Sequence, residues 1–162
     1  MDRGILWQIL KKRCKNEEEQ SLVELIIKLH KDSIIQIGEH SINAEMGLPQ
    51  GSVLSPVLFN IYLEEALKSS TKLEEMRRRG DLLAFADDML VMSNSKQEIE
   101  TIIEELAVLQ LKWNLRLNKR KSEILTAESF TEIGGIKCTK QVKYLGVKVA
   151  IDKKEQLRIS KE

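Results

Sequence analysis

The stretch from Leu82 to Met92 reads Leu-Leu-Ala-Phe-Ala-Asp-Asp-Met-Leu-Val-Met, and it decides more about the fold than any other part of the chain. Two apolar runs joined by Asp87 and Asp88 indicate a tight hairpin whose strands are largely buried. Carboxylates in such surroundings need a partner, because taking charge out of water costs free energy. No Lys or Arg lies within the stretch, so a divalent cation that prefers oxygen ligands is a natural candidate. The alternative is a polar turn with its tip in water, since Asp is common in turns.

The composition is that of an ordinary globular protein. The 162 residues are 42% hydrophobic and 31% charged, which argues against wholesale disorder and suits one domain. The formal net charge of +1 gives no global basic field of the kind that indicates nucleic acid. Cations are instead gathered in short runs, each of which alone is typical of a solvated face or helix end: Lys11-Lys12-Arg13, Arg77-Arg78-Arg79 and Lys119-Arg120-Lys121.

The cysteines and histidines do not predict a metal centre. Cys14 and Cys138 are isolated and lack the spacing of zinc ligands, and the chain has only 2 histidines. Isolated cysteines are typical of reduced thiols in an intracellular protein. They do not indicate whether it lies in the nucleus, an organelle or the bacterial cytoplasm. No apolar stretch approaches membrane-spanning length, and the N-terminus lacks the pattern of a signal peptide. We therefore expect an intracellular protein that does not enter a membrane.

Apolar periodicity predicts helices alternating with short strands. Helices are predicted around residues 5–10 and 22–29, over 53–68 after a loop at 47–56, and over 96–115. Short strands are predicted at 33–37, 41–46, 122–126, 130–136 and 142–149, with 71–80 as a charged connector. Ser55 before Pro56 predicts a helix cap, and Ser95–Glu98 a capping box. This order predicts the α+β class, with helices packed on one face of a small antiparallel sheet.

Four elements follow one another along the chain: Gly47–Pro56 with Phe59–Leu63, then Phe85–Asp88, Leu117–Ser122 and Val142–Gly146. In this order they resemble the motifs of reverse transcriptases, in the branch of non-LTR retrotransposons and group II introns. The loop Gly47–Pro56, with Phe59–Leu63 behind it, resembles the family's substrate-binding motif, and Phe85-Ala86-Asp87-Asp88 resembles its catalytic box. Leu117–Ser122 is similar to the Asn-x-x-Lys-Ser/Thr element, and Val142–Gly146 to the primer-grip hairpin. Four ordered elements are far more specific than one motif match.

The resemblance implies transfer of deoxynucleotides onto a primer 3′-hydroxyl, directed by RNA. Asp87 would be the principal metal ligand and Asp88 a weaker or second-ion ligand, in a site for two ions of Mg²⁺ or Mn²⁺. Lys121 would stabilise charge near the triphosphate and donate a proton to pyrophosphate. The implied nucleotide-binding residues are Pro49, Gln50, Gly51 and Phe85, and the implied primer grip is Tyr144, Leu145 and Gly146. The implied partners are an RNA template, a DNA primer and deoxynucleoside triphosphates.

Without the resemblance, the same residues have plainer interpretations. Phe85 would be a core strand residue, Lys121 a solvated lysine in a basic cluster, and residues 144–146 a strand that turns at glycine. Another palm-type nucleotidyltransferase, such as a cyclase, is disfavoured because it does not need the 47–56 loop.

The resemblance also implies parts that these residues do not supply. In the family's pattern another metal-binding Asp precedes the helix that begins near Arg3, and Asp2 falls at the helix entrance, so it does not match. We expect residues 1–151 to be a partial palm domain without fingers, and 152–162 to be a charged tail at the start of a missing thumb. A separate chain or segment would supply the fingers and the other Asp, so this chain alone would be incompetent. The alternative is a non-catalytic RNA-binding or scaffolding module derived from a reverse transcriptase.

Overall fold

The structure is a computed structural model that describes residues 1–31, 34–37, 40–43 and 46–151. The chain is mixed α/β, as predicted, and divides into two compact units. The first unit comprises Met1–Ser69 with Lys112–Leu115, and the second Ser70–Leu111 with the residues from Arg116 onward. Each unit is described below by itself. The predicted tail at 152–162 and the predicted strand ends at 33 and 44–45 lie outside the described residues.

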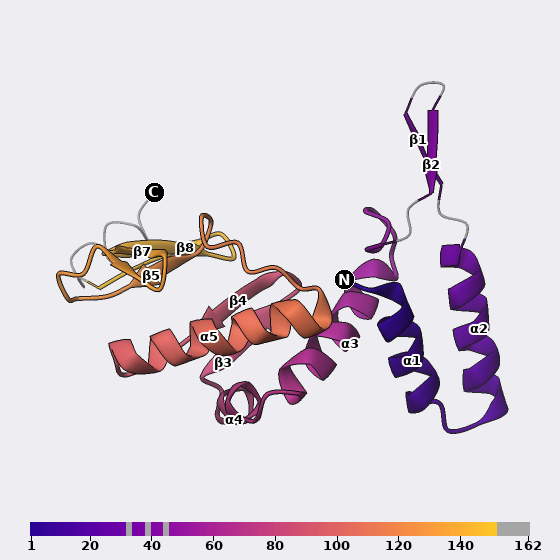
Figure 1. The fold of residues 1–162 in the computed structure, drawn as a ribbon, viewed down its shortest axis with the longest axis horizontal. Coiled ribbons are helices and arrows are strands. Elements are labelled where there is room, and N and C mark those ends of the chain that lie inside the picture. Colours follow the sequence, from indigo (N-terminus) through magenta and orange to yellow (C-terminus); the bar gives the residue numbers. More distant parts are fainter. Residues whose placement is uncertain (32–33, 38–39, 44–45, 152–162) are drawn as a thin grey trace. The chain divides into compact units, whose positions relative to one another are not determined.

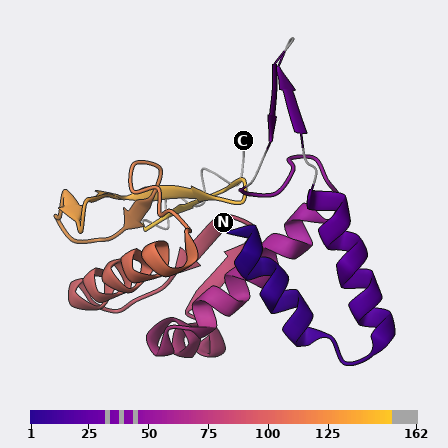
Figure 2. The same ribbon diagram turned by 45° about the vertical axis from the view of Figure 1, so that its right-hand side comes forward.

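The first unit is built on three helices and a hairpin. The helices are α1 (Arg3–Arg13), α2 (Glu17–Lys31) and α3 (Ser55–Lys68), and the strands are β1 (Ile34–Ile37) and β2 (His40–Asn43), paired antiparallel. Helix α1 contacts both α2 and α3, and it lies between them in both views (Figures 1 and 2). The apolar residues at helical spacing meet in one buried cluster: Leu6, Leu10, Val23, Leu58 and Tyr62.

Tyr62 joins α3 to two distant segments of the first unit. Its ring is fully buried and meets the Trp113 ring edge-on at 5.5 Å between centroids. Its hydroxyl donates to the Trp113 carbonyl oxygen at 2.6 Å and accepts from the Asp2 N–H at 3.3 Å. Burial raises the pKa of the Tyr62 hydroxyl, so this group stays a donor at neutral pH.

The second unit contains α4 (Thr71–Arg79), the hairpin of β3 (Leu82–Phe85) and β4 (Asp88–Val91), and most of α5 (Lys96–Trp113). Short strands follow: β5 (Glu123–Leu125), β6 (Glu132–Ile133), β7 (Ile136–Thr139), β8 (Gln141–Tyr144) and β9 (Val147–Ala150). The capping box of α5 is half formed, since the Ser95 hydroxyl accepts from the Glu98 N–H at 3.1 Å while the Glu98 carboxylate is used elsewhere.

The expected connector at 71–80 is a helix instead. Ser70 caps α4 by accepting from the Leu73 N–H, and the Gly80 N–H closes the other end on the carbonyls of residues 76 and 77. Leu73 and Met76 are fully buried. Glu74 pairs with arginines one turn along, Arg77 at 2.7 Å and Arg78 at 2.9 Å. Two buried residues were too few to stand out in a run that is otherwise charged.

The strands do not form the single antiparallel sheet that was predicted. Among the described residues they form four small sheets: β1–β2, β3–β4, β5–β7–β6 and β8–β9. The β5–β7 pair is parallel. This pairing follows from the Gly134-Gly135 turn, because β6 folds back on β7 and leaves the far edge of β7 to β5.

Smaller differences concern helix ends. The expected cap Ser55 is inside α3, and its hydroxyl donates to the Pro49 carbonyl at 2.7 Å. Helix α2 begins at Glu17, ahead of the predicted range 22–29, and its first turn is acidic, which suits the positive end of the helix dipole. Val57, in the first turn of α3, is exposed. None of the helices in the described part of the chain has the length and apolar character needed to cross a bilayer.

The Tyr62 hydroxyl gives a direct test of this packing. Tyr62→Phe keeps the ring but leaves the Trp113 carbonyl without its donor, which should cost about 1–2 kcal/mol of unfolding free energy. Tyr144→Phe is the matched control, because the Tyr144 hydroxyl has no partner among the described residues, and it should change stability by less than about 0.5 kcal/mol. Urea unfolding followed by tryptophan fluorescence measures both. Equal effects would contradict the assigned role.

Candidate functional site

The acidic hairpin is formed as the sequence predicts. β3 and β4 pair antiparallel with Leu82 opposite Val91 and Phe85 opposite Asp88. The connection is therefore the two residues Ala86 and Asp87, the shortest ordinary hairpin loop. The two carboxylates of the pair thus occupy the second turn position and the first position of β4.

The turn holds Ala86 in a conformation that alanine rarely adopts. Its φ is +52°, in the left-handed region, while Asp87 is not among the positive-φ residues. A two-residue hairpin with positive φ at its first position normally has glycine there. For an L-residue that conformation costs roughly 1–2 kcal/mol, and strain of this kind gathers at functional sites. The strained residue here directly precedes Asp87.

The strands of the hairpin are not largely buried, so that part of the prediction is wrong. Leu82 is 1% exposed, whereas Leu83 is 47% and Phe85 65% exposed. Asp87 and Asp88 are exposed as well. A two-stranded sheet has one face against the core and one outward, and the register puts Phe85 and Asp88 on the outward face. Exposure removes the desolvation argument for a cation, and the hairpin tip lies in water as in the alternative interpretation.

The carboxylates still suit a divalent ion in part. Mg²⁺ is usually held by one or two carboxylates together with water and substrate phosphates, and two adjacent exposed aspartates offer such a partial ligand set. Among the described residues, no group of three or more His, Cys, Asp or Glu side chains is placed to hold a metal ion. Any ion at Asp87 and Asp88 would need further oxygen ligands.

Backbone and side-chain contacts anchor the open end of the hairpin. The Met92 N–H donates to the Asp81 carbonyl at 2.8 Å, and the Asp81 N–H donates to the Met76 carbonyl at the end of α4 at 2.9 Å. The Arg79 guanidinium pairs with the Asp81 carboxylate at 3.0 Å. The hairpin is therefore fastened to α4, and only its tip is free.

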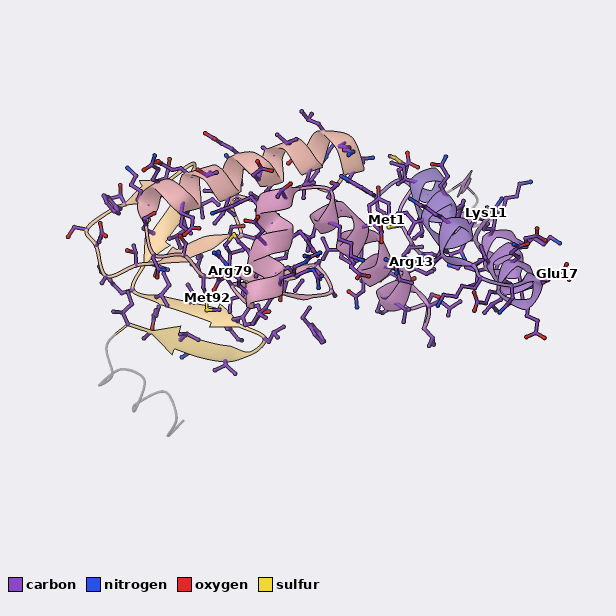
Figure 3. All side chains as sticks on the ribbon, turned by 90° about the horizontal axis from the view of Figure 1, so that it is seen from below. Met1, Lys11, Arg13, Glu17, Arg79 and Met92 are labelled. Atoms are coloured by element: carbon purple, nitrogen blue, oxygen red, sulfur yellow. The ribbon has the colours of Figure 1, made fainter. Side chains whose placement is uncertain are left out.

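A polar pocket adjoins this open end, and sequence reasoning did not find it. Its volume is about 340 Å³, and Figure 3 labels two of its lining residues, Arg79 and Met92; the complete lining is Arg79, Asp81, Met92, Ser93, Asn94 and Glu98. The Glu98 carboxylate accepts two hydrogen bonds, from the Lys72 ammonium at 2.6 Å and from the Ser93 hydroxyl at 2.7 Å. These contacts lower the pKa of Glu98 to about 2, the Lys72 bond contributing most.

The loop with the predicted nucleotide-binding residues belongs to the first unit. Pro49 is half-buried and its carbonyl holds Ser55, whereas Gln50 and Gly51 are exposed. Gly51 has φ +86° and a side chain there would meet no atom within 4 Å, so glycine serves the turn. The Arg3 guanidinium, 8% exposed, donates to the Gly47 carbonyl at 2.6 Å and fixes the start of the loop.

Lys121 lies in a turn that its neighbours build. The Asn118 side chain and carbonyl both accept from the Lys121 N–H, at 3.3 and 3.0 Å, and the Ser122 hydroxyl donates to the Asn118 carbonyl at 3.0 Å. The Asn and Ser of the motif are therefore turn-forming residues. Among the described residues the Lys121 ammonium has no hydrogen bond or ion pair, so it points its charge to solvent.

The predicted primer grip is the turn between β8 and β9. Tyr144 pairs with Val147 across the hairpin, so Leu145 and Gly146 form a two-residue loop. Both have positive φ, +47° and +85°, the pattern of a type I′ turn. Tyr144 is half-buried and Leu145 is exposed. A second exposed turn thus carries the residues that the motif singled out.

The structure brings some of the predicted residues together and leaves others as predictions. Phe85, Asp87 and Asp88 share the tip of one hairpin. Strand β5, which follows the Lys121 turn, contacts β8, which leads into the Tyr144 turn. Gln50 lies in the first unit and Asp87 in the second, so the shared site that the resemblance implies for Gln50, Lys121 and Asp87 stays a prediction.

Comparison with known proteins connects these motifs to one family. The family model described as "Reverse transcriptase (RNA-dependent DNA polymerase)" matches residues 7–149. The Pol polyprotein of the type-2 retrotransposable element R2DM of Drosophila melanogaster is 29% identical over 122 residues, 62% of this chain and 11% of the relative. The telomerase reverse transcriptase of Mus musculus is 26% identical over 109 residues, 67% of this chain and 10% of the relative. No solved structure gives a significant match. The chain spans about a tenth of the length of these curated relatives.

The strain at Ala86 predicts opposite effects of two substitutions. Ala86→Gly should raise stability by about 0.5–1 kcal/mol, because glycine adopts positive φ freely and the relief exceeds its entropic cost. Ala86→Val should lower it, because a β-branched residue is disfavoured most in this region. The control is Ala107→Gly at an exposed position of α5, which should lose about 1 kcal/mol. The melting temperatures of the three variants, compared with that of the parent, test this. A lower melting temperature for Ala86→Gly would contradict the strain at Ala86.

The lowered pKa of Glu98 predicts a particular acid sensitivity. An acid whose pKa falls on folding stabilises the folded state above its ordinary pKa, here 4.5, and this contribution is lost as the pH drops toward 2. Glu98→Gln should therefore unfold more easily at pH 7 and show a flatter decline in melting temperature between pH 4.5 and 2. Glu104→Gln, at an exposed position with no ion pair among the described residues, should keep the slope of the parent. Parallel profiles for all three proteins would count against the Glu98 contacts.

Proposed function

We infer the function of this chain from one premise: it belongs to the reverse transcriptase family, of the non-LTR type. We propose that the chain supplies the palm part of an RNA-directed DNA polymerase. The observation that carries the proposal is the tip of the β3–β4 hairpin, where two adjacent carboxylates stand beside an exposed aromatic ring. The palm assignment and the catalytic roles below rest on the match between this hairpin and the family's motif.

The proposed chemistry is an in-line displacement at the α-phosphate of a deoxynucleoside triphosphate. Asp87 and Asp88 would hold divalent ions, Mg²⁺ or Mn²⁺. When bound, such ions supply electrostatic stabilisation of the attacking and leaving oxygens. The anchoring of the open end of the hairpin to α4 would limit where the two carboxylates can lie before substrate arrives, which favours electrostatic preorganisation.

Other residues would orient the substrates and manage charge. The outward Phe85 ring, directly opposite Asp88, would support the sugar or base at the primer end, since an exposed ring offers a flat apolar surface. The Lys121 ammonium, which has no partner among the described residues, would stabilise the triphosphate and donate a proton to the departing pyrophosphate. Pro49, Gln50 and Gly51 would bind the nucleotide, with the Gln50 amide both donating and accepting.

We propose that full activity needs more of the polymerase than these 162 residues. A third carboxylate would complete the ion site, and fingers and thumb segments would hold the RNA template and the DNA primer. The aligned segments cover only about a tenth of each relative, which supports the proposal that this chain acts as part of a larger polymerase. Tyr144, Leu145 and Gly146 would contribute the surface that holds the primer.

Primer extension tests the proposal. The assay uses an RNA template annealed to a DNA primer, Mg²⁺ and deoxynucleoside triphosphates, with the chain alone and joined to an upstream segment that carries the further carboxylate. In the joined protein, Asp87→Asn should reduce extension by roughly 100-fold or more, because several kcal/mol of ion-based stabilisation are lost. Lys121→Ala should reduce it by roughly 100-fold, the lower range for a general acid.

Two controls remove charge from exposed positions of the same unit. Glu104→Gln matches the aspartate variant, and Arg120→Ala matches the lysine variant by adjacent position; both should retain activity. A folded joined protein that binds RNA but extends no primer would favour the alternative of a non-catalytic RNA-binding module. In that case Asp87→Asn would leave RNA binding unchanged and independent of Mg²⁺.

A further inference from the structure

Helix α2 carries a row of exposed leucines. Leu22, Leu25 and Leu29 are 57%, 53% and 65% exposed. At 3.6 residues per turn their side chains lie within an arc of about 60° on the helix surface, and Glu18 continues the same row toward the N-terminal end. The intervals along this row are four, three and four residues, which is the spacing of a coiled-coil seam. The row therefore has the form of a helix-pairing surface.

The row is not the face by which α2 packs onto its own unit. The buried residues of α2, Val23 and His30, lie about 120° around the helix from the row. Val23 belongs to the buried cluster that also contains residues of α1 and α3, and α1 lies on one side of α2 in Figures 1 and 2. Three large apolar side chains in a continuous row thus face water, and such a patch marks an interaction surface more clearly than scattered exposed leucines do.

The charged residues of α2 are sorted by sign along its length. The first turn holds Glu17, Glu18 and Glu19, the last turn holds Lys28 and Lys31, and all five are exposed. The Glu19 carboxylate accepts from a backbone N–H just ahead of the helix at 2.7 Å. The side chains of the other four make no hydrogen bond or ion pair among the described residues. Figure 3 labels Glu17 at the acidic end. The leucine row therefore runs between an acidic and a basic end whose charges are not compensated locally.

This order of charges favours pairing with an identical helix that runs the other way. In an antiparallel pair the acidic end of each helix lies against the basic end of the other, and the two helix dipoles are also opposed. In a parallel pair, acids would face acids and lysines would face lysines. A surface whose two halves complement each other is self-complementary under a two-fold axis, so the assembly closes as a dimer.

We propose that the row of Glu18, Leu22, Leu25 and Leu29 is a homodimer interface, covered by α2 of a second copy of this chain in antiparallel orientation. Dimerisation through α2 needs neither a metal ion nor a nucleotide, so it stands independently of the proposed polymerase function.

One register satisfies both the leucines and the charges. If the two-fold axis crosses α2 midway between Leu22 and Leu25, these two residues of one copy lie level with Leu25 and Leu22 of the other. At 1.5 Å per residue, Glu18 then lies within about 3 Å, measured along the helix axis, of both Lys28 and Lys31 of the second copy. The same holds for the neighbouring Glu17. The apolar centre of the interface is therefore flanked on each side by opposite charges.

The small area of the interface predicts a weak dimer. Three half-exposed leucines and the charges beside them bury less than about 1,200 Å² in total, at the low end of specific protein interfaces. We expect a dissociation constant on the order of 10 μM, so the fraction of dimer should depend strongly on protein concentration.

Sedimentation velocity of the full 162-residue chain, from roughly tenfold below to tenfold above the expected dissociation constant, tests the interface. The parent should shift from monomer to dimer. Leu25→Glu places a carboxylate from each copy in the apolar centre, so it should raise the dissociation constant by roughly 100-fold or more. Leu111→Glu changes a leucine that is 88% exposed on α5 and should keep the parent's curve. Both leucines are exposed, so both variants should keep the parent's helix content by circular dichroism.

Charge reversal tests the direction of pairing. Glu17→Lys with Glu18→Lys brings lysines against lysines at both ends of an antiparallel dimer, so the dissociation constant should rise by roughly tenfold. In a parallel dimer like charges already face each other, and the constant would not change. Lys28→Glu with Lys31→Glu should weaken the dimer in the same way. An equimolar mixture of the two double variants should recover the parent's affinity, because each copy then offers the charge that the other lacks, and a loss of helix stability would not be recovered.

Four outcomes would overturn the interface. The first is a parent that stays monomeric over the whole concentration range, and the second is a Leu111→Glu variant that dissociates as readily as Leu25→Glu. The third is a mixture of the charge variants that does not recover affinity. The fourth is a monomeric joined protein in which Leu25→Glu lowers the melting temperature, because another segment of the polymerase then covers the row. Primer extension enters none of these outcomes, so failure of the dimer and failure of the polymerase proposal are seen separately.

Discussion

The candidate site depends on the length of one connection. Because Phe85 pairs with Asp88, only Ala86 and Asp87 are left to reverse the chain, and no residue can relax the turn. The register then decides everything else about the hairpin: which face carries Leu82 into the core and which face carries Phe85 and Asp88 outward. A one-residue slip would reverse these faces. The strain at Ala86 is tolerated because the open end is fastened to α4 and because Leu82 is buried.

The other candidate residues also lie on turns or loops whose conformation is held by neighbouring residues. Asn118 and Ser122 close the turn of Lys121, the positive φ of Leu145 and Gly146 closes that of the β8–β9 hairpin, and Ser55 and Arg3 fix the loop of Gln50. Residues on loops held by a rigid scaffold are where binding and catalysis usually lie. A motif residue such as Asn118 can thus hold the turn of Lys121 without contacting substrate in the proposed mechanism.

Much of this arrangement could be predicted from the sequence, and the failures have physical causes. Periodicity identified α1, α2, α3 and α5, and the apolar runs around Asp87 identified the hairpin, because repeated burial on one face leaves a regular pattern. The same runs suggested burial on both faces, which a two-stranded sheet cannot provide. Helix α4 was missed because its stability comes from a cap, a closing glycine and ion pairs along the helix. The ion pair of Glu98 was missed because its partner, Lys72, is distant in the sequence.

Charge shows most clearly what composition hides. A net charge of +1 argues against a basic field around the whole molecule, yet a field near a bound strand depends on how each cation is compensated within a Debye length of about 8–10 Å. In the strand region, the Lys140 ammonium donates to backbone carbonyls, and Lys137 has a glutamate opposite it on each neighbouring strand. Lys121, Lys143 and Lys148 keep their charge for solvent or a ligand. A near-neutral chain can therefore bind a polyanion, provided that its fold pairs some cations with acidic residues and leaves other cations unpaired.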